Sequence, residues 1–311
     1  LFRSGFGDGF QRYADIESSD AEQCDDARVA DAAIEAIEHA RGRPWFLYVH
    51  TMGPHAPYAP PPGYAERFEG QTLPEHGGTR TNTDSDQTTN KQKRNQKSTR
   101  TSTKNGLSTQ RASRPSPEQE HGLSSEGPPG RPATVRVGQD AERRAILDRY
   151  DGEIAYADEQ FGRVVDALDS TGQYDNTVVL LVSDHGEEFW DHGGMDHGRT
   201  LYEEMLRVPC LLRLPGGAGA GERREQLIEM IDVGPTLLEL ADLSSMPQWQ
   251  GRSFVPIIED DAPSERIGYA SLLFNEHSLR AARTPATKYI RDVAAQTENW
   301  FDLAHDPCEQ K

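Results

Sequence analysis

Residues 177–204, TVVLLVSDHGEEFWDHGGMDHGRTLYEE, join an apolar run to a segment crowded with acidic and histidine side chains. The first six residues are β-branched or leucine, and such an uninterrupted run predicts a strand covered on both faces, which is typical of a parallel sheet. Polar side chains begin directly after the run, at Ser183. Because ligands bind at the carboxyl ends of strands in open α/β sheets, Asp184 and His185 are expected to lie at a functional site.

Helix and strand signals alternate along much of the chain. An apolar periodicity over residues 29–37 predicts a helix, and WFLYVH at 45–50 predicts a second buried strand. A longer apolar stripe predicts a helix ahead of the 177–182 strand, and VPCLL at 208–212 predicts a third strand before another helix at 237–243. Such alternation predicts an α/β fold with a mostly parallel sheet flanked by helices. The stripe consists of Ile146, Tyr150, Ile154, Ala157, Phe161, Val165 and Leu168.

Residues 71–140 differ in composition from the sequence on either side. Between residues 78 and 120 only Leu107 and Ala112 have aliphatic side chains, so this segment cannot bury enough apolar surface to offset the entropy lost on ordering. We therefore predict a low-complexity, disordered insertion at 71–140 within an α/β domain made of residues 1–70 and 141–262. Short β-type runs after residue 266 predict a small C-terminal α+β subdomain with antiparallel strands over 263–311.

The 311-residue chain carries a formal net charge of −18, although residues 71–140 hold more basic than acidic side chains. The α/β part is therefore strongly acidic, which argues against nucleic acid as a partner. Cys24, Cys210 and Cys308 lie far apart and define no disulfide framework. The sequence shows neither an apolar run long enough for a membrane span nor a signal peptide, and it begins at Leu1, so we expect a piece of a longer protein.

Side chains that follow the predicted strands are candidates for a site. Asp184 and His185 offer an oxygen and a nitrogen ligand to a divalent cation. An isolated Asp-His pair is more often a turn cap with an exposed histidine, but the position after a buried strand favours the metal site. His55, held between Pro54 and Pro57, suits general acid work or a hydrogen bond to an anionic substrate, although a surface-loop histidine gives the same pattern.

Several motifs, in sequential order, resemble the sulfatases, a family of the alkaline phosphatase-like superfamily. They are FLYVHTMGPHAPY at 46–58, YDGEIAYADEQFGRVVDAL at 150–168, SDHGE followed by GRTLYEE and RVP within 183–209, IDVGPTLLELADL at 231–243, and NWFDLAHDPCEQ at 299–310. The resemblance covers nearly all of the chain outside residues 71–140, and SDHGE with GRTLYEE and RVP is its most specific part. It implies an alkaline phosphatase-like fold.

The resemblance implies roles for individual residues. Asp184 and His185 match the downstream pair of ligands of one divalent metal, which in sulfatases is usually calcium, with manganese or zinc as alternatives. Many calcium enzymes have asparagine at the second place, and histidine is commoner there in phosphate and phosphonate relatives. His55 matches the histidine that contacts the sulfate and aids departure of the alcohol. His197 falls where the family often has a lysine for the same oxygens.

Two elements of the family pattern are absent from the sequence. Sulfatases hold an upstream Asp-Asp metal pair and a C-x-P-S-R or S-x-P-S-R motif whose Cys or Ser becomes formylglycine. CDDAR at 24–28 has Cys and Arg at the right separation, but Asp26 replaces the proline and the segment lies within a predicted helix. We therefore expect formylglycine in a part of the protein upstream of Leu1.

Together these features predict a sulfuric ester hydrolase that cleaves a small-molecule or glycan sulfate ester with metal assistance, the chain alone being inactive. His50 and His192 are candidate substrate contacts. The alternatives are a phosphodiesterase, phosphonate hydrolase or phosphoethanolamine transferase of the same superfamily, or a truncated, non-catalytic product, which the long insertion favours. A periplasmic or extracellular location fits the family and is otherwise undecided.

Overall fold

A computed structural model describes residues 26–71, 133–260, 266–274 and 277–311. The described residues 26–71 and those after residue 140 belong to one structural unit, which holds all of the candidate site residues. Most of the predicted insertion lies outside the described residues. Its described end, from Ala133, is the beginning of a long helix. None of the described helices is long and apolar enough to cross a membrane.

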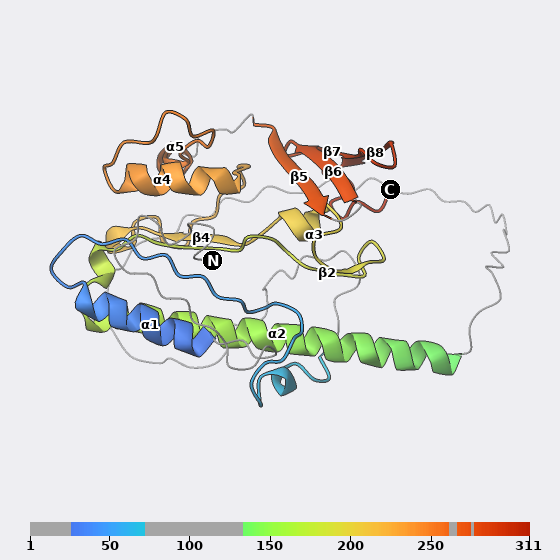
Figure 1. The fold of residues 1–311 in the computed structure, drawn as a ribbon, viewed down its shortest axis with the longest axis horizontal. Coiled ribbons are helices and arrows are strands. Elements are labelled where there is room, and N and C mark those ends of the chain that lie inside the picture. The colour runs from blue at the N-terminus through green and yellow to red at the C-terminus, as the bar shows by residue number, and fades with distance from the viewer. Residues whose placement is uncertain (1–25, 72–132, 261–265, 275–276) are drawn as a thin grey trace, which may run out of the picture. The chain divides into compact units, whose positions relative to one another are not determined.

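Helices α1 (Asp26–His39) and α2 (Ala133–Ser170) lie side by side along the C-terminal part of α2 (Figure 1). Ala30, Ala33 and Ile37 are buried, which confirms the predicted apolar face of α1. The stripe predicted for α2 is only partly correct, because Ile154 is 43% exposed whereas Glu153 beside it is 2% exposed. The inner face of α2 therefore carries a buried carboxyl group that the apolar periodicity did not reveal.

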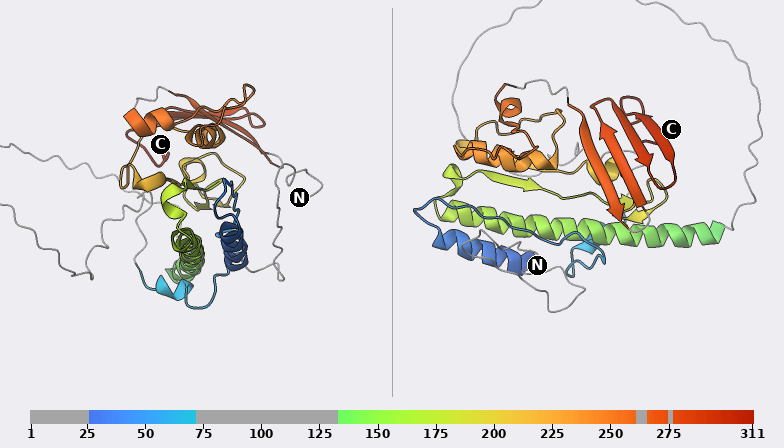
Figure 2. Two further views of the ribbon diagram at one scale, coloured as in Figure 1. Left: turned by 90° about the vertical axis from the view of Figure 1, so that its left-hand side faces the viewer. Right: turned by 45° about the horizontal axis from the view of Figure 1, so that its top comes forward.

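Strands β1 (Val179–Val182) and β4 (Cys210–Arg213) form a two-stranded sheet with Val182 opposite Cys210. This sheet lies between α1 and α2 on one side and α4 (Val233–Leu240) and α5 (Val255–Asp260) on the other (Figure 2). The layers match the predicted α/β class. The expectation that these two strands run parallel is wrong, since their pairing is antiparallel. The connection between them has only short elements, without the long crossover helix that joins parallel neighbours.

Residues 45–50 do not form the predicted strand. Phe46 is 67% exposed and Tyr48 is 51% exposed, whereas a buried strand needs both faces covered. The segment is tied to the C-terminal end of α2 by a hydrogen bond of 2.9 Å from Trp45 Nε1 to Gln173 Oε1. It leads the chain from α1 to the loop that contains His55.

The connection from β1 to β4 contains a hairpin of β2 (Glu188–Phe189) and β3 (Met195–Asp196), followed by helix α3 (Glu203–Leu206). Single 3-10 turns punctuate the loops elsewhere: η2 (Ala65–Arg67), η3 (Tyr174–Asn176), η4 (Pro215–Gly217) and η5 (Met230–Asp232). Asp184 and His185 lie between β1 and this hairpin, His192 lies within it, and His197 directly follows β3.

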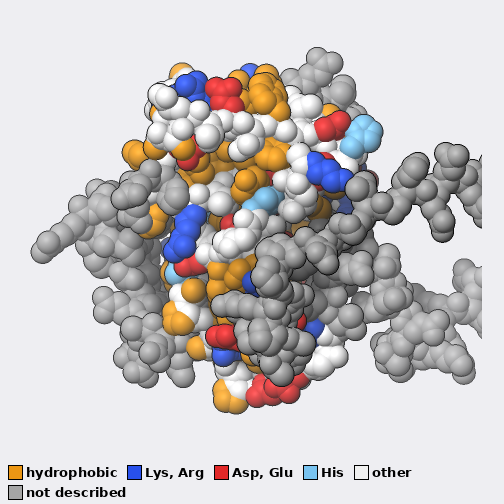
Figure 3. Space-filling view, turned by 90° about the vertical axis from the view of Figure 1, so that its right-hand side faces the viewer, with side chains coloured by type: hydrophobic (Ala, Val, Ile, Leu, Met, Phe, Trp, Pro, Cys, Tyr) orange, Lys and Arg blue, Asp and Glu red, His pale blue; other side chains and the backbone are white. Residues whose placement is uncertain are grey.

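The C-terminal strands confirm the predicted antiparallel subdomain. They are β5 (Gly268–Phe274), β6 (His277–Arg283), β7 (Thr287–Asp292) and β8 (Thr297–Asp302), in the order β5-β6-β7-β8. A buried cluster joins this sheet to the segment before α3; its members are Leu201, Ala281, Ile290, Phe301 and Leu303. Other apolar side chains remain at the surface, including Leu273 and Trp300, and Figure 3 shows hydrophobic side chains exposed among charged ones on one face.

Candidate active site

The chain turns sharply after β1, at Ser183–His185, and the turn is held by local hydrogen bonds. Ser183 Oγ donates to the His185 carbonyl oxygen at 2.7 Å, and the His185 backbone N–H donates to Asp184 Oδ1 at 2.9 Å. The Asp184 side chain is 70% exposed. Asp184 thus caps the turn and also presents its carboxylate to solvent, so the two interpretations of this residue are compatible.

Helix α3 packs directly behind this turn. The Gly186 backbone N–H donates to the Met205 carbonyl oxygen at 2.9 Å. A Cβ atom at position 186 would lie 1.8 Å from the Glu204 carbonyl oxygen, so only glycine allows this approach. The position of Asp184 and His185 is therefore fixed by α3 as well as by β1.

Three of the predicted histidines lie together. The His185 and His197 rings stack with their centroids 4.3 Å apart, and the His55 ring contacts that of His197 edge-on at 4.9 Å. His185 follows β1 and His197 follows β3, whereas His55 comes from the loop after α1, more than a hundred residues earlier in the sequence. The fold thus assembles the group from two distant segments.

The ring orientations of His55 and His185 follow from their hydrogen bonds. His55 Nδ1 lies 2.6 Å from the Ala56 carbonyl oxygen, and His185 Nδ1 lies 2.8 Å from that of Gly186. A carbonyl oxygen only accepts, so each contact places a proton on Nδ1. In the neutral rings Nε2 is then left with its lone pair, as a base or a metal ligand requires.

His197 is held by two carboxylates. Its Nδ1 lies 3.2 Å from Glu187 Oε1 and 3.0 Å from Asp196 Oδ1, and the Glu187 side chain is only 5% exposed. The ligand atoms of these three residues all lie within 4.8 Å of one another, so they are a second set that could hold a cation. Tyr58 lies beside them: burial, followed by the charges of Glu187 and Asp196, raises the pKa of its phenol.

Asp184 and His185 fit one metal ion in part. The Asp184 Oδ1 and His185 Nε2 atoms are 3.8 Å apart, and one ion can contact both after a small side-chain adjustment. They supply two ligands, whereas calcium takes roughly 6 to 8, all of them oxygen. An imidazole ligand suits manganese or zinc better than calcium.

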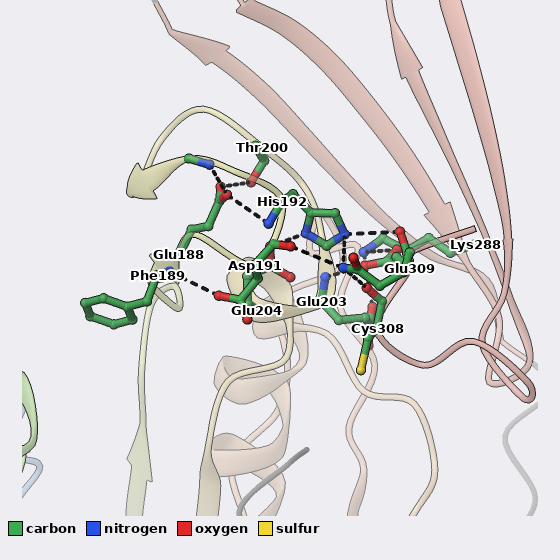
Figure 4. A network of polar contacts seen from close by, with 12 residues as sticks. Glu188, Phe189, Asp191, His192, Thr200, Glu203, Glu204, Lys288, Cys308 and Glu309 are labelled. Carbon is green, nitrogen blue, oxygen red and sulfur yellow. Dashed lines mark hydrogen bonds and ion pairs between the residues drawn. The ribbon is translucent and has the colours of Figure 1, made fainter. Parts of the chain in front are cut away.

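His192 occupies a different environment, shown in Figure 4. Its Nδ1 lies 2.7 Å from Glu204 Oε1, its Nε2 lies 3.1 Å from the Glu309 carbonyl oxygen, and its ring stacks on Tyr202. Burial opposes protonation of His192, but the Glu204 hydrogen bond and the charges of Glu204 and Glu309 raise its pKa on balance. Both ring nitrogens are engaged, which favours a structural role over the predicted substrate contact.

A buried ion-pair network continues from His192 into the C-terminal sheet. Lys288 Nζ lies 2.9 Å from Glu309 Oε1 and 3.2 Å from Glu203 Oε1, and the Lys288 side chain is fully buried. Arg283 contacts both oxygens of Glu203 at 2.9 Å. Burial alone would raise the pKa of Glu203, but the Arg283 hydrogen bonds and the Lys288 charge lower it. Glu309 Oε2 also accepts the Glu203 backbone N–H, at 2.7 Å, so the C-terminal segment anchors α3.

His50 stands apart from the histidine group. Its side chain is exposed, and among the described residues its ring contact is with Tyr48, at 6.3 Å between centroids. Substrate contact by His50 stays a prediction. Three other residues at the site escaped the sequence analysis: Glu187, Asp196 and Glu153. Glu153 could have been noticed as a carboxyl group next to Gly152 on the inner side of a helix.

A sulfatase family model matches residues 3–243 of the sequence. The chain belongs to the sulfatase family. A second model, for the C-terminal region of N-sulphoglucosamine sulphohydrolase, matches residues 190–311. The family assignment agrees with the resemblance carried by the SDHGE, GRTLYEE and RVP motifs.

Individual relatives agree with this assignment. The chain is 32% identical to the arylsulfatase of Clostridium perfringens over 177 residues, which are 56% of this chain and 36% of that protein. It is 30% identical to the multifunctional alkaline phosphatase superfamily protein PehA of Trinickia caryophylli over 203 residues, 59% and 38% of the two chains. The matched part of this sulfatase-family chain thus spans less than two fifths of either relative.

Solved structures confirm the alkaline phosphatase-like fold. The yidJ protein of Bacteroides fragilis superposes with a TM-score of 0.64 at 19% identity, covering 92% of this chain and 53% of that one. A sequence identity of 19% shows the fold alone. The superposition covers nearly the whole chain, so both the α/β part and the C-terminal sheet belong to it.

Proposed function

We propose that this chain is part of a sulfuric ester hydrolase that cleaves a sulfate ester with the help of a divalent metal. Family membership supports this proposal, and the observation that carries it is the convergence of His55, His185 and His197 beside the Asp184 turn. Chemistry at this position needs groups that bind the anionic ester and a group that protonates the departing alcohol. The three imidazoles can supply both.

His55 is the general acid of this proposal. Its Nδ1 is fixed by the Ala56 carbonyl oxygen, so the proton for the departing alcohol is carried at Nε2 of the protonated ring. His197, whose Nδ1 is held by Glu187 and Asp196, directs its Nε2 to the sulfate oxygens. A carboxylate that accepts from Nδ1–H orients a catalytic imidazole in the same way in other hydrolases.

Asp184 and His185 would hold the metal, through Oδ1 and Nε2. When bound, a divalent ion supplies positive charge that stabilises negative charge developing on the ester oxygens. The remaining ligands and the formylglycine nucleophile are proposed to come from sequence upstream of Leu1. Manganese or zinc fits the His185 donor better than the calcium expected from the family resemblance.

The proposed substrate is a sulfated sugar. The match of residues 190–311 to the C-terminal model of N-sulphoglucosamine sulphohydrolase supports this class, since it includes β3, α3 and the C-terminal sheet. The negative net charge of the chain repels a large polyanionic glycan unless the metal offsets that charge. A short sulfated oligosaccharide is therefore the favoured substrate.

A second candidate is hydrolysis of a phosphate or phosphonate ester. Two observations favour it: histidine at position 185, and 30% identity to PehA, which is described as multifunctional within the alkaline phosphatase superfamily. The two reactions need the same metal and the same general acid and differ in the ester group. Relative rates on the two esters decide between them.

The test compares the 311-residue chain with the complete gene product on p-nitrophenyl sulfate and on a p-nitrophenyl phosphate diester, each with calcium, manganese or zinc. We expect turnover of p-nitrophenyl sulfate by the complete protein only. In His55→Ala we expect a loss of about 100-fold or more on a sugar sulfate, whose alcohol needs a proton to depart, and a smaller loss on the nitrophenyl ester, on the scale of general acid catalysis. His305→Ala, an exposed histidine on the C-terminal segment, is the matched control and should retain activity. Preference for the diester would replace the first proposal by the second, and an inactive complete protein would favour a non-catalytic product.

A further inference from the structure

Two buried carboxyl groups lie beneath the loop that carries His55. Asp26, at the start of α1, is 1% exposed, and Glu153, in the middle of α2, is 2% exposed. They are close enough for the charge of Asp26 to act on Glu153. Acidic side chains are almost never this buried unless they are paired, and the described residues offer neither of them an ion pair.

Both carboxyl groups bind the backbone of the loop on either side of His55. The Ala59 N–H, on the C-terminal side of His55, donates to Glu153 Oε1 at 2.6 Å. The Gly53 N–H donates to Asp26 Oδ1 over a longer distance, 3.5 Å. Backbone donors at positions 53 and 59, on either side of His55, are therefore held by two side chains from two helices.

The packing of α2 makes room for this contact. A Cβ at Gly152 would lie 2.8 Å from the Ala65 backbone nitrogen and 3.0 Å from Pro60 Cγ, so the absence of a side chain there lets the chain after His55 settle onto the helix. Farther along α2, Glu159 accepts a hydrogen bond of 2.8 Å from the Tyr64 hydroxyl. Residues 59–64 thus contact α2, and the contact with Glu153 is the one nearest to His55 in the sequence.

We propose that Glu153 is a positioning residue for His55: its carboxylate fixes the loop backbone, and thereby the direction of the imidazole, with Asp26 as a second anchor. The role deepens the proposed function, on which it rests, because His55 is the general acid there. Ring rotation in His55 is restricted by its own Nδ1 contact with Ala56, so its direction follows the backbone that Glu153 holds.

The anchor should respond to pH near neutrality. Burial raises the pKa of Glu153 to about 7, and the charge of Asp26 adds to the shift, while the hydrogen bond from Ala59 and the nearby backbone and charge of His55 oppose it. The charge of Glu153 in turn acts on the Tyr150 phenol, on the same helix. A charged carboxylate accepts stronger hydrogen bonds than a protonated one, so the loop is held more tightly above this pH. One oxygen each of Asp26 and Glu153 is buried without a hydrogen-bond partner among the described residues, which leaves a place for the proton.

The experiment follows the backbone amide of Ala59, and the His55 ring Cε1–H, by NMR of the 311-residue chain between pH 5 and 9. In the wild-type chain the Ala59 amide should shift with a midpoint near 7. Glu153→Gln keeps an accepting oxygen without a charge, so this amide should stay hydrogen-bonded and lose the titration. In Glu153→Ala the His55 ring signal should broaden or move.

Glu159→Gln is the matched control, since it alters the same helix and the same segment through Tyr64 and should leave the titration of the Ala59 amide unchanged. The proposal is overturned if the Ala59 amide titrates alike in the wild type and in Glu153→Gln, or if Glu153→Ala lowers the melting temperature with an unchanged His55 ring signal. No turnover is measured, so a complete protein that fails to cleave sulfate esters would remove the proposed function and leave the positioning result standing.

Discussion

Replacing Lys288 by methionine tests whether the buried ion-pair network holds the C-terminal sheet to α3. Methionine retains most of the apolar stem and removes the charge. Lys288 Nζ contacts Glu309 Oε1 at 2.9 Å and Glu203 Oε1 at 3.2 Å, and the side chain is fully buried. Glu203 keeps Arg283 as its partner after the change, whereas the 3% exposed Glu309 loses Lys288, its ion-pair partner among the described residues.

The expected loss in free energy of unfolding comes from the buried charge of Glu309 after Lys288 is removed. Removing one partner of a buried pair typically costs about 3–5 kcal/mol, because the other charge stays buried and uncompensated. The double variant Lys288→Met with Glu309→Gln removes both charges and should regain the larger part of that loss. Arg291→Met on the same strand is the control: Arg291 is half exposed and 3.9 Å from Glu298, so about 1 kcal/mol or less is expected.

Urea unfolding followed by tryptophan fluorescence and by circular dichroism gives the free energy of unfolding for the four proteins. Agreement of the two probes is needed because a chain of this size can unfold in more than one step. A Lys288→Met chain within about 1 kcal/mol of the wild type would refute the reasoning, as would a double variant less stable than Lys288→Met.

Three further changes follow from the geometry. Gly186→Ala should lower the free energy of unfolding by about 1–3 kcal/mol or more, because its Cβ would lie 1.8 Å from the Glu204 carbonyl oxygen. Gly162→Ala, at a position on α2 with open space around it, should be neutral or stabilising. Thermal melting of the two variants distinguishes these outcomes. His192 has a raised pKa in the folded state, so its contribution to stability is complete below about pH 6.5 and is lost as the pH rises through the folded-state pKa. The free energy of unfolding in urea should therefore differ most between His192→Gln and the wild type at low pH. A difference that is the same at every pH would contradict this. Glu153 binds its proton more tightly in the folded chain, where its pKa is about 7 rather than 4.5. The free energy of unfolding should therefore fall as the pH rises from 4.5 to 7, by at most about 3 kcal/mol. Glu153→Gln should abolish this dependence on pH.

The C-terminal sheet and the long helix were predictable because their determinants are local. Antiparallel strands joined by short turns pair with sequence neighbours, so the β-type runs after residue 266 were sufficient to predict β5 to β8. The motif order within 183–209 was sufficient to identify the family, which the match over residues 3–243 shows. The sharp turn after β1 could likewise be expected from a strand that ends in polar residues and glycine.

Contacts between distant segments were decided by the tertiary structure. Periodicity reports whether a side chain faces inward, not what it meets there, so Glu153 was missed on α2 while the exposed Ile154 was counted as core. The antiparallel pairing of β1 with β4 and the irregular path of residues 45–50 depend on which neighbours each segment has in space. His55 reaches His197 because Glu153 and Tyr58 dock its loop onto α2 and the β2 strand, a packing that depends on residues about a hundred positions apart in the sequence.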